Sequence, residues 1–212
     1  MGIDNLRYLF YTIVLVAQSL FSQPHYFVGG NWGYFIQHSE NKNPITRNNE
    51  LKNSYGLNLG VEYPLNKNRY FQIEFGRFTS EIGENIIGAS EDGQPLHIGT
   101  WSLREVTFPL EVRLFWSNKK MTGYGYGLTL TNTNHYYIRE SSYYTFEDIF
   151  HSTGVGINWT ARFSKKIGED LYLLSNITMR YINAVKFYGR GRDFSNFQHN
   201  YLQICLSLGL GK

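Results

Sequence analysis

The chain of 212 residues contains a single cysteine, Cys205, and only five prolines. One cysteine excludes an internal disulfide framework and a zinc site built on cysteine ligands. The formal net charge is only +3, and no run of lysine and arginine forms a basic patch. We therefore expect no nucleic-acid partner. Histidine, aspartate and glutamate are scattered along the chain, so we propose no metal site and no cofactor.

Long apolar runs are also scarce, and the one that stands out lies near the N-terminus. Arg7 precedes the apolar run Leu9 to Ala17, which a short polar segment follows. This order is typical of a secretory signal peptide, so we assign residues 1–22 to a signal peptide and residues 23–212 to the barrel domain described below. The alternative is a membrane-anchoring helix, although the run is shorter than the ~20 apolar residues that a spanning helix needs.

Aromatic residues and glycine are abundant, and they alternate with a period of two. The chain has 17 Tyr, 15 Phe and 21 Gly. From Tyr55 to Tyr63, aromatic or aliphatic residues occupy every second position, and Gly, Asn and Glu lie between them. Such a period places the two sets on opposite faces of a β-strand, which Tyr and Phe also favour.

The same alternation recurs in eight segments and predicts an all-β fold, an eight-stranded antiparallel transmembrane β-barrel. A phase slip near Arg104 and Glu105 suggests a β-bulge in the fourth strand. Short turns alternate with long polar connections, which is the layout of short periplasmic turns and four longer outer loops. The predicted strands cover about 26–37, 55–63, 69–80, 101–116, 121–132, 153–164, 170–183 and 197–210. The predicted long loops lie near 38–53, 81–100, 132–152 and 185–196.

The apolar set is the larger of the two, and we expect it to face lipid. The interior of an eight-stranded barrel is just wide enough for side chains, which suits the Gly, Ser, Thr and Asn of the second set. Tyr63, Trp116 and Phe163 lie near the predicted periplasmic turns, where outward aromatic residues form a girdle at the membrane interface. Closure of the barrel leaves no unpaired strand edge in hydrocarbon.

Charged residues on the polar face are predicted to lie inside the barrel, in its periplasmic half. They are three glutamates and three arginines: Glu62, Glu74, Glu111, Arg113, Arg162 and Arg180. Buried charges need partners because their desolvation is costly. We predict a Glu–Arg network that bridges the strands and plugs the lumen. The alternative is that some of these charges contact lumenal water without fixed partners.

Three segments resemble the small outer-membrane β-barrels, meaning the OmpX-like proteins and the OmpA-like transmembrane domains. They are Tyr55 to Pro64, the strand around Phe108-Pro109-Leu110, and the glycine-alternating strand Gly123 to Gly127. The resemblance covers residues 26–210. It implies the cell outer membrane, with the lipid bilayer, lipopolysaccharide, the outer-membrane assembly machinery and an unknown surface or envelope protein as partners. The Ser-Gln end of the signal segment and the Tyr- and Asn-rich composition resemble exports of Bacteroidota.

Groups able to act as nucleophile, base or acid occur in the predicted outer loops. They include His38, Ser39, Glu40, His97, His135, Glu147, Asp148, His151 and Ser152. Some barrels of this size are lipid A deacylases, and that resemblance would require serine two positions after histidine on one strand face. No histidine meets this condition, since Thr153 stands at that spacing after His151. We therefore predict no enzymatic activity and no catalytic residue.

The predicted function is that of a non-enzymatic outer-membrane barrel with a structural or surface-interaction role. A narrow passive, porin-like channel is the main alternative. A lipid A-modifying enzyme is a weaker one, and so is a lipocalin-like binder, because Gly30-Asn31-Trp32 is similar to the Gly-x-Trp element of lipocalins. Lys186, Arg190 and Arg192 make one outer loop basic and are candidate contacts for lipopolysaccharide phosphates; an ordinary solvated loop is the competing interpretation.

Overall fold

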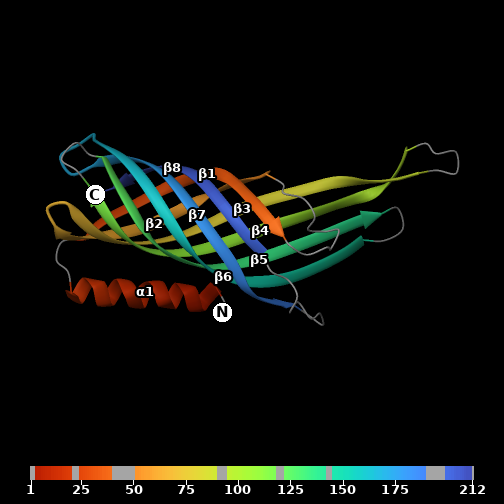
Figure 1. Ribbon diagram of the computed structural model, residues 1–212, viewed down its shortest axis with the longest axis horizontal. Helices are drawn as coiled ribbons and strands as arrows, with labels where there is room; N and C mark the ends of the chain where they lie inside the picture. The colour runs from red at the N-terminus through yellow and green to blue at the C-terminus, as the bar shows by residue number, and fades with distance from the viewer. Residues whose placement is uncertain are drawn as a thin grey trace.

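The computed structural model of the protein describes residues 3–20, 24–39, 51–89, 95–117, 122–141, 145–189 and 199–211. Within these ranges one helix is followed by eight long strands (Figure 1). Their bounds are α1 Ile3–Leu20, β1 His25–Ser39, β2 Leu51–Asn66, β3 Arg69–Ala89, β4 Pro95–Ser117, β5 Thr122–Ser141, β6 Thr145–Lys166, β7 Tyr172–Gly189 and β8 His199–Gly211.

The eight strands form a closed antiparallel barrel in which each strand pairs with its neighbours in sequence. The first and last strands close the ring, from Phe27 opposite Gly211 to Ser39 opposite His199. Each predicted segment overlaps one of these strands. The predicted fold class is therefore confirmed.

Alternate residues of each strand face opposite sides of the barrel wall. On β2, Leu57 and Leu59 are exposed on the outer surface, whereas Asn58 between them is buried in the interior. Outward aliphatic side chains are left largely uncovered, and Leu128 on β5 keeps 67% of its surface exposed. A continuous apolar exterior of this kind is favourable in hydrocarbon and costly in water.

Two of the predicted outer loops are largely strand, which corrects the sequence interpretation. β3 continues to Ala89 and β4 begins at Pro95, and the two pair along this extension. Likewise β5 continues to Ser141 and β6 begins at Thr145. Both extensions project beyond β1 and β8 (Figure 1). Beyond the hydrocarbon layer both faces of a strand meet polar surroundings, so the apolar alternation that reveals membrane strands is lost.

The β-bulge predicted at Arg104 and Glu105 is wrong. The pairing there is continuous, with Glu81 opposite Arg104 and Ser80 opposite Glu105, and the β3–β4 register shifts instead at Ile86. Arg104 is exposed on the outside, while Glu105 contacts interior residues of neighbouring strands. Two adjacent charged residues therefore face opposite sides of the wall, and the sequence pattern obscures this regular alternation.

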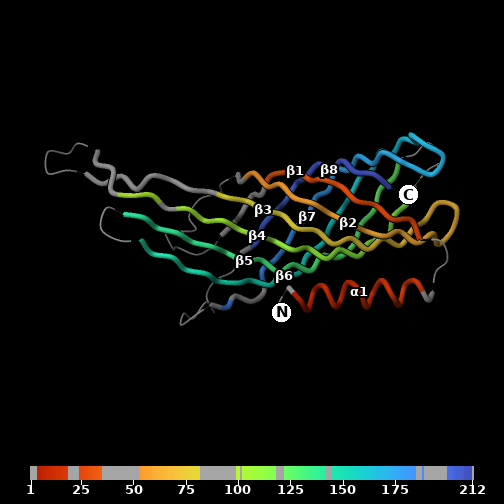
Figure 2. The backbone as a smooth tube through the Cα atoms, turned by 180° about the vertical axis from the view of Figure 1, so that it is seen from behind, coloured from red at the N-terminus to blue at the C-terminus, as the bar shows by residue number. Residues whose placement is uncertain are grey.

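Helix α1 lies along the outside of the barrel beside β3 and β4 (Figures 1 and 2). The ring of Phe10 lies 5.8 Å from that of Phe75 on β3. Val61 and Ile73, which lie on the outer face of the wall, share one buried apolar cluster with the helix. In the described part of the chain, no helix combines the length and hydropathy needed to cross a membrane. The assignment of residues 1–22 to a signal peptide stays a prediction.

The three aromatic residues predicted for the periplasmic girdle differ in their surroundings. Phe163 is exposed on the outer surface. The ring of Trp116 stacks on that of Tyr126, with centroids 5.1 Å apart. Tyr63 is fully covered, because α1 packs over it and its hydroxyl donates a hydrogen bond to the Val14 carbonyl oxygen at 3.2 Å.

Candidate functional site

All six charged residues selected from the sequence lie in the interior, where they form two groups. One group, here called the periplasmic pair, consists of Glu62 and Arg162 near the short turns. The other, here called the central charge network, joins β3, β4 and β7 and consists of Glu74, Glu111, Arg113 and Arg180.

The strongest contact of the central charge network joins Arg180 on β7 to Glu111 on β4. Arg180 Nε donates to Glu111 Oε1 at 2.8 Å, and Arg180 Nη2 donates to Glu111 Oε2 at 2.7 Å. Each side chain is only 1% exposed. Two parallel charge-assisted hydrogen bonds fix both the distance and the orientation of the pair. Because β4 and β7 are not adjacent in the barrel, this pair crosses the lumen.

Arg113 completes the central charge network from the β4 side. It pairs with Glu111, and its Nη1 lies 3.1 Å from Glu74 Oε2 on β3. The same nitrogen donates to Gln72 Oε1 at 3.1 Å. Two carboxylates and two guanidinium groups therefore balance in formal charge, which offsets much of the cost of burying each ion.

Neutral side chains from further strands make hydrogen bonds to the charged groups of the network in addition to the ion pairs. Amide and hydroxyl groups satisfy buried charges without adding charge of their own. The contacts are Asn58 Nδ2 to Glu74 Oε1 at 2.7 Å, Thr129 Oγ1 to Glu111 Oε1 at 3.1 Å, and Arg180 Nη1 to Gln203 Oε1 at 3.3 Å. With these contacts the network reaches β2, β5 and β8 as well.

The periplasmic pair is held between two aromatic rings. Arg162 pairs with Glu62, and its Nε donates to Asn176 Oδ1 at 2.9 Å. Its guanidinium carbon lies 4.5 Å from the centroid of the Phe115 ring and 5.5 Å from that of Phe27. Cation–π contacts of this kind strengthen when water is excluded.

The rings of Phe115 and Phe27 are the reason why glycine occupies several positions of the alternating pattern. A Cβ atom at Gly123 or Gly125 would collide with the ring of Phe115, and one at Gly60 would collide with that of Phe27. Each ring therefore lies against a strand that carries no side chain at that point. The glycine-alternating strand from 123 to 127 is a packing requirement of the narrow interior.

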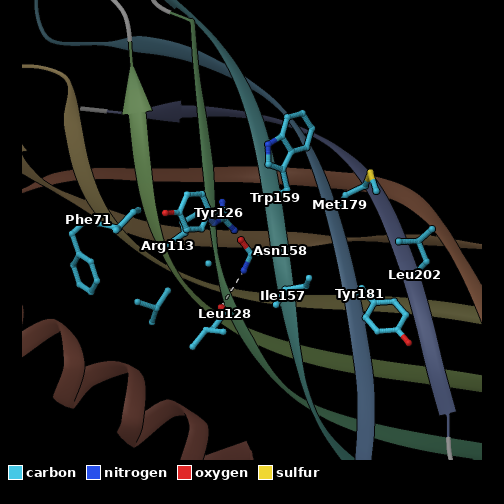
Figure 3. A pocket seen from close by; sticks show the side chains of 13 residues that line it. Phe71, Arg113, Tyr126, Leu128, Ile157, Asn158, Trp159, Met179, Tyr181 and Leu202 are labelled. Carbon is cyan, nitrogen blue, oxygen red and sulfur yellow. Dashed lines mark hydrogen bonds between the residues drawn. The ribbon is translucent and has the colours of Figure 1, made fainter.

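Two of the hollows in the described part of the barrel lie on opposite sides of its wall. A cavity of about 310 Å³ lies at the periplasmic end and is lined in part by Glu62 and Arg162. The other, shown in Figure 3, is lined by outward apolar side chains such as Leu128 and Trp159, with Asn158 behind the wall donating to the Leu128 carbonyl at 3.1 Å. Its apolar lining and outward position suit lipid chains.

A further polar group lies in the interior of the extended strands, and the sequence criterion missed it. His135 Nδ1 is 2.9 Å from Glu105 Oε1, and His135 Nε2 is 2.8 Å from Ser152 Oγ. These residues come from β5, β4 and β6. The search for serine two positions after histidine followed one strand, whereas this contact joins two paired strands. The register of β5 against β6, which places Thr133 opposite Ser152, is what brings His135 and Ser152 together.

Another candidate from the outer segments, His151, lies apart from this group, and the side chains of His38, Ser39, Glu40 and His97 are outside the description. His151 packs on the outer side, where its Nδ1 lies 2.8 Å from Asn134 Oδ1. Lys186 lies on β7, but its side chain is outside the description, and Arg190 and Arg192 lie outside the described residues altogether. Among the described residues, no group of three histidine, cysteine, aspartate or glutamate side chains could hold a metal ion.

Comparison with known proteins finds similarity in structure alone. No family model and no curated protein matches the sequence. A major outer membrane protein from Thermus thermophilus aligns with a TM-score of 0.52 and 9% identity, over 90% of this chain and 100% of that one. Ail of Yersinia pestis aligns at 0.49 and 9% identity (90% and 99% covered), and Neisserial surface protein A at 0.43 and 11% (88% and 95%). At 9% identity, the likeness to the Thermus thermophilus protein shows the fold alone.

A closed eight-stranded barrel with an apolar exterior and a charged, paired interior defines a membrane-spanning β-barrel. The fold is that of the small outer-membrane β-barrels, as the sequence resemblance implied, and the protein belongs in the cell outer membrane. Its exterior contacts the lipid bilayer. The neighbours give no support to the resemblance to Bacteroidota exports.

Proposed function

We propose that this protein is a closed outer-membrane barrel with a structural or surface-interaction role, and that it does not conduct solutes. The observation that carries this proposal is the central charge network, which spans the lumen from β4 to β7 with Glu111 and Arg180. An eight-stranded barrel has little interior space beyond its own side chains. An ion passing through would have to displace paired charges that are buried in a medium of low dielectric constant.

The partners of such a barrel follow from its surfaces. We propose that its outer end contacts lipopolysaccharide, because Arg104, close to the β3–β4 extension, is exposed on the outward side of β4. Lys186, Arg190 and Arg192 remain proposed anion contacts, and guanidinium groups bind phosphate in bidentate geometry. The assembly machinery and a surface or envelope protein complete the proposal. We also propose that the segment 1–22 is removed on export.

Single-channel recording in a planar bilayer tests the closed lumen. The purified protein, whose folded form is verified by a gel shift on boiling, should show no steady openings. Arg180→Ala removes the side chain that crosses the lumen and should produce openings in the fraction that remains folded. Glu140→Ala, a change at an exposed residue of the β5 extension, is the matched control and should stay silent. Steady openings of the folded wild-type protein would instead establish a narrow channel.

A further inference from the structure

The interior of the barrel beyond the central charge network holds an acid, a base and a hydroxyl in one line. Glu105, His135 and Ser152 come from the three consecutive strands β4, β5 and β6. The imidazole lies between the other two, with 2.9 Å from Nδ1 to the carboxylate and 2.8 Å from Nε2 to the hydroxyl. We propose that these residues form a nucleophilic triad that hydrolyses carboxylic esters entering from the outer end of the barrel. This activity goes beyond the role proposed above, which requires no catalysis.

The contacts of His135 assign a role to each of its ring nitrogens. A carboxylate only accepts hydrogen bonds, so Nδ1 carries the proton and donates it to Glu105. Nε2 is then the acceptor and faces the hydroxyl of Ser152, as a general base must. The acid is itself oriented, because Ser80 Oγ donates to Glu105 Oε2 at 3.3 Å.

The imidazole is also fixed by packing. Its ring stacks on that of Phe150, with centroids 4.4 Å apart and planes 5° from parallel. Phe150 and Ser152 stand on the same face of β6, so one strand both holds the ring and presents the nucleophile. Triad side chains placed on paired strands keep their geometry better than side chains on loops. A register shift between Thr153 and Gly154 in the β6–β7 pairing lies directly beside Ser152, and such irregularities often re-aim a side chain at a functional site.

Other polar groups in the same interior show what simple hydrogen bonding looks like there. Thr107 and Thr133 join their hydroxyls at 3.0 Å, and Thr160 and Thr178 do the same. Such pairs satisfy two neighbouring strands with no ionisable group. An imidazole between a carboxylate and a serine also makes hydrogen bonds between neighbouring strands, but its burial costs more desolvation free energy. In return, this arrangement provides a nucleophile together with its base.

Ser152 and His135 are buried in the barrel interior, 4% and 7% exposed, so an ester has to enter from the outer end to reach the hydroxyl. On the outer surface of β6, Ile149 and Val155 on either side of this position are both exposed apolar residues. Ser152 therefore lies behind the apolar exterior, on the inner side of the wall. Tyr201 from β8 reaches into this region, where its hydroxyl donates to Thr131 Oγ1 at 3.3 Å.

The reaction proceeds in two balanced steps. Ser152 Oγ attacks the carbonyl carbon of the ester while its proton moves to His135 Nε2, and the tetrahedral intermediate expels the alcohol, which takes that proton. Water then attacks the acyl-serine after giving a proton to His135 Nε2. The acid leaves, and the proton returns to Ser152 Oγ. The net change is ester plus water to carboxylic acid plus alcohol, with no other reactant.

Covalent labelling with a short alkyl fluorophosphonate tests the triad on the folded full-length protein. The probe should modify Ser152, identified by peptide mass spectrometry. Ser152→Ala should abolish labelling. His135→Asn, which keeps a donor toward Glu105 and removes the base, should slow labelling by at least about 100-fold. Ser54→Ala is the matched control, because Ser54 is a buried interior serine whose contact is the amide of Gln203, and it should label like the wild type.

Ester hydrolysis then identifies the source of the substrate. Turnover of p-nitrophenyl butyrate that is lost in Ser152→Ala indicates small soluble esters, and turnover of p-nitrophenyl palmitate alone indicates esters of lipid chains. Absence of labelling at Ser152 in wild-type protein that is folded by gel shift would overturn the triad. Labelling that persists unchanged in His135→Asn would overturn it as well. Neither outcome bears on the closed lumen, which is measured by conductance.

Discussion

The two polar layers of the interior differ in kind. The central charge network neutralises two carboxylates with two guanidinium groups, and Glu111 pairs with both arginines. In the outer layer, the carboxylate of Glu105 contacts a histidine and one serine, and the histidine contacts a second serine. Guanidinium groups hold a carboxylate in a fixed charged state, whereas an imidazole can exchange protons at physiological pH. The central layer therefore suits closure and stability, and the outer one suits proton transfer.

The largest expected effect follows from removing the acid of the central layer. Glu111→Ala leaves Arg180 and part of Arg113 buried without their partner, so the free energy of unfolding should fall by about 3–5 kcal/mol. Urea unfolding in lipid vesicles measures it. The double change Glu111→Leu with Arg180→Met should recover most of the loss, since it removes both charges of one pair. A double variant no more stable than Glu111→Ala would show that the ion pair is not the origin of the loss.

A smaller loss is expected at the periplasmic pair. Arg162→Lys keeps the charge but loses the planar group that lies between Phe27 and Phe115. Because Lys cannot donate in the same fork geometry, we expect a loss of about 1–2 kcal/mol in the same unfolding assay. Lys165→Ala, a change at an exposed residue nearby, should stay within about 0.5 kcal/mol of the wild type. If Arg162→Lys and Lys165→Ala lowered the free energy of unfolding equally, the contacts with the aromatic rings would not account for the effect.

The same two layers show what could be predicted from the sequence. The membrane strands were recognisable because one face meets hydrocarbon, so that from Tyr55 to Tyr63 every second residue is apolar. Glu111 was selected because it interrupts such a strand on its polar face. Glu105, His135 and Ser152 lie where strands continue beyond the hydrocarbon layer, and there polarity no longer distinguishes the two faces. The contacts among these three residues depend on the registers of β4 with β5 and of β5 with β6. A search along one strand gives no information about those registers.

The outer layer should contribute less to stability than the central one. His135→Asn retains the donor toward Glu105 and loses the contact with Ser152, a neutral hydrogen bond whose net contribution is about 1 kcal/mol. The urea midpoint should therefore shift only slightly, while fluorophosphonate labelling falls as described above. If His135→Asn destabilised the barrel as strongly as Glu111→Ala, the outer layer would be a second structural network and its separate role would be lost.

The smallest effect is expected at Ser80, which touches the triad only through Glu105. The hydrogen bond from Ser80 Oγ to Glu105 Oε2 is long at 3.3 Å, so Ser80→Ala should lower the free energy of unfolding by about 0.5–1 kcal/mol. If Glu105 orients His135 for proton transfer, Ser80, which holds Glu105, affects the reactivity of Ser152 more than the stability of the barrel. Labelling of Ser152 should then slow several-fold in Ser80→Ala and remain unchanged in Ser54→Ala. Equal labelling rates in these two variants would show that Ser80 does not position the acid, and the triad would consist of its three members alone.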